Sequence, residues 1–281
     1  MRQALRALLV CAALCGAGPA VAADTTIRIG TTPVFLDDQA SFLGAWQHYM
    51  EKRLGRPVRF VQRGSYREIT DLVRADRLDF AWVCSPPYLR NRDRMVLAAV
   101  PVHRGRPLYQ SYLIVPASDR TTHGFADLRG KVYAFSDPDS NSGWLAPQAA
   151  MRHLHIDSST YFKRTFFTWA HKKVVEAVAV GMAQGGSVDG YVWETLKVLH
   201  PELTARTRVA WKSPWYGFPP IIARRSIEPG ELARMQDLLI GMNDDAEGRI
   251  LLKQLDLDGF ERGSDALFEG VQENLKYVLG L

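Results

Sequence analysis

Strand-like and helix-like segments alternate at the start of this chain, and their order constrains the fold more than any other feature. Apolar and polar residues alternate over 26–30, as in a half-buried strand, and apolar residues at helical spacing follow until Gly55. A second strand is predicted over 58–62, a second helix over 66–77 and a third strand over 78–83. This order predicts a parallel sheet with helices on its faces, which binds ligands at the carboxyl ends of its strands.

The rest of the chain predicts a second α/β unit and then a return to the first. The apolar segment 112–115 is expected to be a strand where the chain crosses between the units. The second unit is expected to contain a short helix over 125–130, a strand over 131–135, a helix after Asp139, a helix over 172–184 and a strand over 190–192. The proline-containing segment 209–222 then returns to the first unit, and 228–281 is predicted to be mostly helical.

The first 22 residues have the pattern of a secretion signal. Arg2 and Arg6 precede an apolar run over 7–14, and the small residues at 20 and 22 form a cleavage motif. The apolar run is too short to cross a bilayer, which requires about 20 residues. We therefore expect the mature chain to begin near Ala23 and to be exported from the cytoplasm.

Cysteine usage limits what can stabilise the exported chain. Cys11 and Cys15 lie in the signal segment, where either would carry the lipid of an anchored form, although neither follows the small residue that such an anchor requires. Cleavage leaves Cys84 alone, so no disulfide forms within the chain and the hydrophobic core must hold the fold together.

Charge and histidine spacing exclude two classes of site. The 35 Lys and Arg residues and the 30 Asp and Glu residues are interspersed, which argues against a basic arm that binds nucleic acid. His123, His153 and His155 lack the spacing of metal ligands. We expect neither a metal nor a cofactor.

The stretch 135–144 carries the strongest chemical pattern in the chain. A strand ends in the polar turn Ser140-Asn141-Ser142, and a helix follows. The first amides of a helix have no internal partners and the positive end of the helix dipole lies behind them, so an anion binds there without a metal. The side chains of the turn add further hydrogen-bond donors. The alternative is that Ser140 or Ser142 only caps the helix.

The sequence around this turn resembles the ligand loop of the phosphonate, phosphite and phosphate binding proteins of ABC transporters. The shared pattern is Asp-Pro-x-Ser-x-Ser-Gly at 137–143, followed by Leu145 and Pro147. Further matches occur in the same order along nearly the whole exported chain: 55–58, Tyr66, 78–81 with Tyr88, Tyr109 with Ser111 and Tyr112, 127–131, His171, Ala177 and Val178 with Gly181, and 188–190. Each match is weak alone, and their order is what identifies the family.

The resemblance implies an α/β fold of the two-lobed class II periplasmic binding protein type, in which each lobe is a mostly parallel sheet flanked by helices. It assigns 23–112 to the first part of lobe 1 and 113–214 to lobe 2. The segment 215–281 would form the return crossover and C-terminal helices that pack on lobe 1. Such proteins hold their ligand in the cleft and close both lobes over it.

The resemblance also implies the residues of the ligand site. Ser140, Asn141 and Ser142 would bind the oxygens of the anion, His171 and Tyr112 would line the cleft, and Tyr66 and Tyr88 would lie near it. Two departures favour a simple oxyanion over an aminophosphonate. Val34 follows Pro33 where the family often has tyrosine, and only Glu194 follows Gly190 as a partner for a ligand amine.

Cys84 lies at the edge of the expected cleft and allows three interpretations. It is a small buried hydrophobic residue, a soft ligand for a thiophilic species such as arsenite, which some members of this superfamily sense through a cysteine, or the nucleophile of a thiol enzyme. An enzyme is not expected, because no glycine turn for an oxyanion hole adjoins Cys84 and the prolines at 86 and 87 remove two backbone donors.

Two functions therefore stay open at this stage. The first is a monomeric periplasmic receptor that captures phosphate, phosphite or a phosphonate and delivers it to the permease of an ABC importer. The second is a sensory binding protein for an oxyanion or arsenite that docks on a membrane histidine kinase. Both share the fold and the small-anion ligand, and neither involves nucleic acid.

Overall fold

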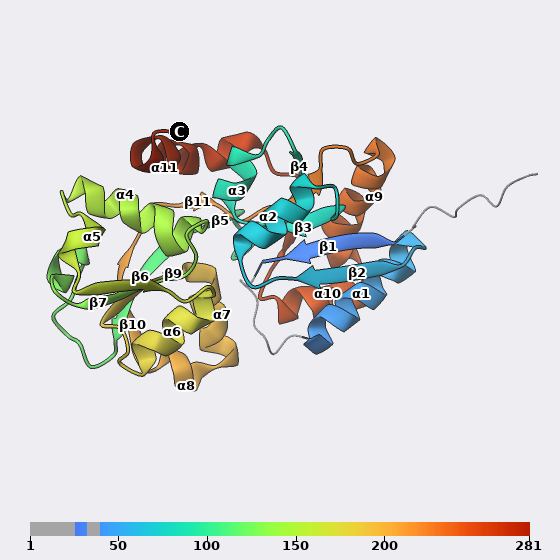
Figure 1. Cartoon of the computed structure of the whole chain (residues 1–281). Helices are drawn as coiled ribbons and strands as arrows, with labels where there is room; N and C mark the ends of the chain where they lie inside the picture. Colours follow the sequence, from blue (N-terminus) through green and yellow to red (C-terminus); the bar gives the residue numbers. More distant parts are fainter. Residues whose placement is uncertain (1–25, 33–39) are drawn as a thin grey trace, which may run out of the picture.

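The computed structural model describes residues 26–32 and 40–281. The expected signal segment 1–22, Pro33 and Val34 lie outside the described residues. Figure 1 shows two lobes side by side, with the short strands β5 (Leu108–Tyr109) and β11 (Tyr216–Gly217) between them. No described helix has both the length and the hydrophobicity needed to cross a membrane.

The first lobe is built on a six-stranded sheet. In spatial order its strands are β13 (Gly259–Glu261), β4 (Met95–Val102), β12 (Ile221–Arg224), β3 (Phe80–Trp82), β1 (Ile27–Thr31) and β2 (Val58–Gln62). β1 runs parallel to β2 and β3, as the alternating order of the sequence predicts. β12 runs antiparallel to β3 and β4, and β13 runs antiparallel to β4.

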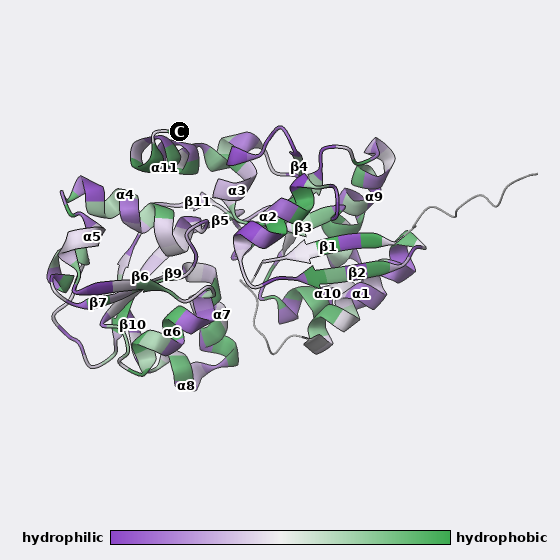
Figure 2. Ribbon diagram, in the orientation of Figure 1, coloured by the Kyte–Doolittle hydropathy of each residue, from purple (hydrophilic) through white to green (hydrophobic). Residues whose placement is uncertain are grey.

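Helices cover both faces of this sheet (Figure 1). On one face α1 (Ala40–Leu54) contacts both α9 (Pro229–Ile240) and α10 (Ala246–Gln254), and α2 (Tyr66–Arg74) and α3 (Ser85–Arg90) lie opposite. Ser65 caps α2, because its hydroxyl accepts a hydrogen bond from the Glu68 N–H. The buried residues of α2 recur at helical spacing, and Figure 2 shows the resulting alternation of polar and apolar faces.

The second lobe is built on a five-stranded sheet. In spatial order its strands are β10 (Thr207–Lys212), β6 (Ser111–Pro116), β9 (Gly185–Asp189), β7 (Val132–Phe135) and β8 (Arg164–Phe167). The helices are α4 (Ala146–His153), α5 (Ser158–Tyr161), α6 (His171–Ala179), α7 (Gly190–Leu199) and α8 (Pro201–Thr204). A Cβ at Gly186 would lie 2.5 Å from Val174 Cγ1, so this glycine lets α6 pack directly on β9.

The C-terminal helix α11 (Glu269–Leu279) contacts both lobes. On one side it packs on α3, and on the other it packs on α4 (Figure 1). The His153 and Tyr277 rings stack with centroids 4.6 Å apart, and Arg152 donates to the Tyr277 carbonyl at 3.1 Å. The end of the segment 215–281, expected to pack on lobe 1, therefore also holds lobe 2.

Both sheets are mixed, whereas the expectation was of mostly parallel sheets. β7 runs parallel to β8 and β9, but β6 is antiparallel to β9 and to β10. Two of the reversed strands, β6 and β12, are those through which the chain enters a lobe at a crossover, where it passes between the sheets without the helix that a parallel connection requires. The third, β13, lies within the C-terminal part of the first lobe.

The strand predicted over 190–192 is wrong. The strand of this region is β9, and α7 begins at Gly190. The Asp189 carboxylate accepts hydrogen bonds from the N–H groups of Tyr191 and Val192, which caps the helix where the apolar composition alone favours a strand.

Candidate functional site

The turn at Ser140, Asn141 and Ser142 is buried between the lobes, with all three residues 0% exposed. It opens a helical segment, η3 (Asn141–Leu145), that continues into α4. The Ala146 N–H bonds to the Asn141 carbonyl, a wide spacing that often marks functional sites in helices. Ser140 Oγ accepts from the Gly143 N–H at 2.9 Å, so Ser140 caps the helix and also lies in the candidate site.

Asp137 connects this turn to the first lobe. One carboxylate oxygen accepts from the Asp139 N–H at 2.7 Å, and the other accepts from the Tyr66 N–H at 3.2 Å. Asp139 in turn pairs with Arg90 and, at 3.8 Å, with Arg67. These contacts join α2 and α3 of the first lobe to the loop of the second lobe.

His171 supplies a neutral donor at the base of the turn. Its Nδ1 accepts a hydrogen bond from the Asp189 N–H at 3.0 Å. Burial lowers the pKa of His171 to about 3, so the imidazole is neutral and carries its proton on Nε2. Nε2 lies 3.4 Å from Ser140 Oγ, which orients that hydroxyl toward the cleft.

Asp189 is the acidic group of the site, and the sequence reasoning did not single it out. It is 1% exposed and caps α7. Burial raises its pKa to about 7, and its carboxyl lies beside the Ser142 hydroxyl. An aspartate between a buried strand and a helix is the sequence signal that points to such a position.

The first lobe contributes Cys84, Tyr66 and Tyr109 to the same cluster. Cys84 Sγ accepts from the Asn141 N–H at 3.3 Å, and Tyr109 OH accepts from Asn141 Nδ2 at 3.1 Å. Tyr66 is 1% exposed and its hydroxyl lies near Cys84 and Ser140. The sequence predicts Tyr109 only as a residue of a family motif, because nothing in the neighbouring sequence indicates that it contacts a ligand.

Three buried polar atoms of this cluster have no hydrogen bond of regular geometry within the described residues. They are Tyr66 OH, Asn141 Oδ1 and Ser142 Oγ. Leaving a buried polar group unpaired costs about 1–3 kcal/mol. Tyr66 lies in the first lobe and Asn141 and Ser142 in the second, so a small anion between them would accept from the two hydroxyls, and one that carries a proton would also donate to Asn141 Oδ1.

Two predicted site residues lie elsewhere. Tyr88 OH donates to Asp265 at 2.6 Å, and its ring packs on Phe268 near α11. Tyr112 OH donates to Glu194 at 3.3 Å. The structure therefore brings Ser140, Asn141, Ser142, His171, Tyr66 and Cys84 together, and it places the hydroxyls of Tyr88 and Tyr112 in other contacts.

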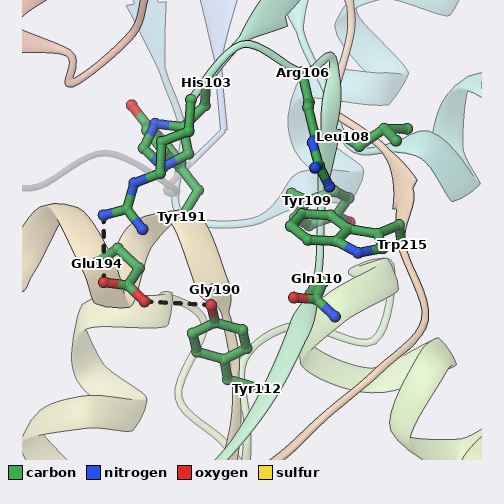
Figure 3. Close-up of a pocket in the computed structure, with 11 residues that line it drawn as sticks. His103, Arg106, Leu108, Tyr109, Gln110, Tyr112, Gly190, Tyr191, Glu194 and Trp215 are labelled. Atoms are coloured by element: carbon green, nitrogen blue, oxygen red, sulfur yellow. Dashed lines mark hydrogen bonds and ion pairs between the residues drawn. The ribbon is translucent and has the colours of Figure 1, made fainter.

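Tyr112 belongs to a separate pocket of about 320 Å³ on the hinge side, shown in Figure 3. Glu194 lies on one wall, paired with Arg104 at 3.4 Å, and Trp215 lies opposite. Tyr109 lines this pocket, and its hydroxyl accepts a hydrogen bond from Asn141 in the turn at 140–142. Glu194, the expected partner of a ligand amine, is already engaged by Tyr112 and Arg104.

The cluster can bind a small anion through hydrogen bonds without a cation. Hydroxyls, backbone N–H groups and a neutral imidazole converge on it, as in other anion sites at helix N-termini. Within 26–32 and 40–281, no group of His, Cys, Asp and Glu residues has the arrangement of a metal site. Burial raises the pKa of Cys84 to about 12, which makes the thiol a poor nucleophile and a poor soft ligand.

A family model described as the ABC transporter, phosphonate, periplasmic substrate-binding protein matches residues 29–268. The chain belongs to this family. A phosphonates-binding periplasmic protein from Escherichia coli K12 is 28% identical over 223 residues, which cover 77% of this chain and 65% of the relative. A phosphate-import protein, PhnD, from Mycolicibacterium smegmatis is 25% identical over 67% of this chain and 63% of the relative. The chain thus spans just under two thirds of the length of these curated relatives.

The fold of this phosphonate-binding family is confirmed by solved structures. PhnD1 from Prochlorococcus marinus, in complex with methylphosphonate, superposes with a TM-score of 0.83 and 16% identity, covering 92% of this chain and all of that one. The two-lobed α/β architecture and the family resemblance expected from the sequence are therefore correct.

Proposed function

We propose that this protein captures a small oxyanion of the phosphate, phosphite or phosphonate type between its lobes for an ABC importer. The observation that carries the proposal is the buried turn at 140–142, whose donors face Tyr66 and Cys84 of the first lobe. The family model and the names of the relatives, which bind phosphonates or import phosphate, support the same ligand class.

Asp189 narrows the range of anions that the proposed site would bind. Asp189 lies beside the Ser142 hydroxyl and has a pKa raised to about 7 by burial. A carboxyl at this position accepts a hydrogen bond from a protonated oxyanion, or donates one when it is itself protonated. The ionised carboxylate favours anions that carry a proton over sulfate, which has none near neutral pH, whereas the protonated carboxyl would donate to either.

The proposed receptor function also requires export from the cytoplasm and delivery of the ligand to a transporter. The expected signal at 1–22 would place the protein in the periplasm, where it would act as a monomer and present its ligand to a membrane permease. Co-purification with the permease of an ABC importer, rather than with a sensor kinase, would support delivery to a transporter.

Ser142→Ala is expected to weaken anion binding by about 1.5–3 kcal/mol, the range for hydrogen bonds to charged groups. Stability should change less than affinity, because within the described residues the Ser142 hydroxyl has only loose contacts with Asp189 and Tyr109. Isothermal titration calorimetry with phosphate, phosphite, methylphosphonate, aminoethylphosphonate and sulfate measures the loss. Ser118→Ala, on the surface, is the matched control.

The screen on the wild-type protein tests the function itself. The protein must first be unfolded and refolded in anion-free buffer, so that a bound ligand does not mask the titration. If none of the five anions binds at millimolar concentration, the protein is not an oxyanion receptor.

A further inference from the structure

The sulfur of Cys84 lies where the first lobe meets the turn at 140–142 of the second lobe. Cys84 is 3% exposed and precedes α3. Its Sγ accepts a hydrogen bond from the Asn141 N–H at 3.3 Å. This N–H is the first of the helical segment, the kind of group that donates directly to an anion at a helix N-terminus. The thiol thus forms part of the wall of the proposed anion site.

The thiol has hydroxyl groups beside it, although Cys84, Tyr66 and Tyr109 all belong to the buried core. The hydroxyls of Tyr66 and Tyr109 lie close enough to Cys84 to interact with it electrostatically. Tyr66 OH is buried and has no regular hydrogen bond within the described residues, and the same holds for Ser142 Oγ. Among those residues, Tyr66 OH has only a loose contact with Ser140, and Ser142 Oγ only loose contacts with Asp189 and Tyr109. These poorly satisfied hydroxyls, one from each lobe, are the second sign that a polar ligand binds beside the sulfur.

The chemistry of the thiol differs from that of every other group in the cluster. Burial, with a smaller contribution from the Asp189 charge, raises the pKa of Cys84 to about 12, so the thiol stays protonated and neutral. An S–H group is a weak donor and its sulfur is large and polarisable. It therefore accommodates an apolar substituent well and stabilises an anionic oxygen poorly.

We propose that Cys84 is a specificity-determining residue of the anion site. The oxygens of a tetrahedral phosphorus oxyanion bind the hydroxyl and amide donors, and the fourth substituent contacts the sulfur. Phosphite, with hydrogen there, and methylphosphonate, with a methyl group there, fit this wall. Phosphate and sulfate place a fourth oxygen against a thiol that donates weakly. This inference rests on the proposed function, since it concerns the same site.

The decisive comparison is between Cys84→Ser and the wild type. Serine keeps the size and shape of the side chain but supplies a strong O–H donor in place of the thiol. The ratio of the phosphate Kd to the methylphosphonate Kd, from calorimetry on refolded, anion-free protein, is expected to exceed ten in the wild type. In Cys84→Ser the ratio should fall at least threefold, mainly because phosphate binds more tightly.

Cys84→Ala is the matched control, because it removes the thiol without adding a donor. It should keep the preference for methylphosphonate within about twofold, whereas a residue that only packs the core would lower stability in both variants and leave the ratio unchanged. A fall of less than threefold in Cys84→Ser, or a wild type that prefers phosphate, overturns the inference. If no anion binds the wild type at all, the proposed function fails first and this inference fails with it.

A second measurement does not depend on the variants folding. Cys84 is the one cysteine of the chain beyond the signal segment, so the exported protein has a single S–H stretching band in its Raman spectrum. Methylphosphonate and phosphite should shift this band, because the ligand lies against the thiol. A band that does not move at saturating methylphosphonate places the ligand away from Cys84 and overturns the proposal.

Discussion

Gly143→Ala should nearly abolish anion binding, although it adds a single methyl group. A Cβ at this position would lie 1.7 Å from Ser136 Oγ and 3.1 Å from His171 Cε1. Neither neighbour can move freely, because Ser136 and His171 are buried. Over-packing of this kind costs up to about 3 kcal/mol, and if the turn moves to relieve it, affinity falls by about a hundredfold. Calorimetry with methylphosphonate measures the loss.

A second substitution should restore part of the binding. Ser136 Oγ has no hydrogen bond within the described residues, so Ser136→Gly removes the clashing atoms without breaking a contact. The double variant should recover at least tenfold in affinity. Gly44→Ala is the control, since a Cβ there meets nothing within 4 Å. Full affinity in Gly143→Ala alone would show that the turn does not bind the anion.

Asp189 and His171 are expected to give opposite pH dependences of stability. The pKa of Asp189 is raised to about 7 in the folded protein, so the folded state binds its proton more tightly and loses stability as pH rises from about 4 to about 7. The pKa of His171 is lowered to about 3, so the unfolded state binds that proton more tightly and folding gains stability as pH rises from about 3 to about 6.5. Between about pH 4 and 6.5 the two effects largely cancel.

The Asp189→Asn variant separates the effect of Asp189 on stability from that of His171. Asparagine still caps α7, but it removes the group that loses stability with rising pH. The free energy of unfolding of the variant, relative to wild type, should rise between pH 4 and pH 7 by as much as about 4 kcal/mol, at 1.36 kcal/mol per pKa unit. Urea unfolding in anion-free buffers at half-unit pH steps measures the difference. His171→Gln should gain relative to wild type as pH falls instead. A difference curve that is flat for both variants would mean that neither group is titrated by folding.

The sequence predicts the elements of the first lobe up to β3 because each of them has a local signal. The alternation over 26–30 and the helical spacing of apolar residues over 66–77 can each be seen within a few residues of sequence. The antiparallel strands β12 and β13 carry no such signal, because their direction depends on where the chain returns to the sheet. Long-range pairing of this kind is set by tertiary contacts, which a short window of sequence does not contain.

The residues of the candidate site also fall into those with a local sequence signal and those without one. Ser140 and Ser142 stand in a recognisable strand-turn-helix pattern, whereas Tyr109 and Asp189 reach the cluster only because β5 and β9 end beside it. Tyr88 shows the opposite case. Its sequence motif matches the family, but its hydroxyl finds Asp265, which lies 177 positions further along the chain.

The contacts of α11 with the two lobes bear on the affinity for a ligand that binds between them. The helix packs on α3 of one lobe and α4 of the other, with Tyr277 stacked on His153, so opening the cleft must separate it from one of them. The apparent Kd of a ligand that needs closed lobes depends on the fraction of molecules that are closed. For the proposed anion, contacts beneath this helix would therefore adjust the apparent affinity, and selection could tune capture and release without altering a group that touches the ligand.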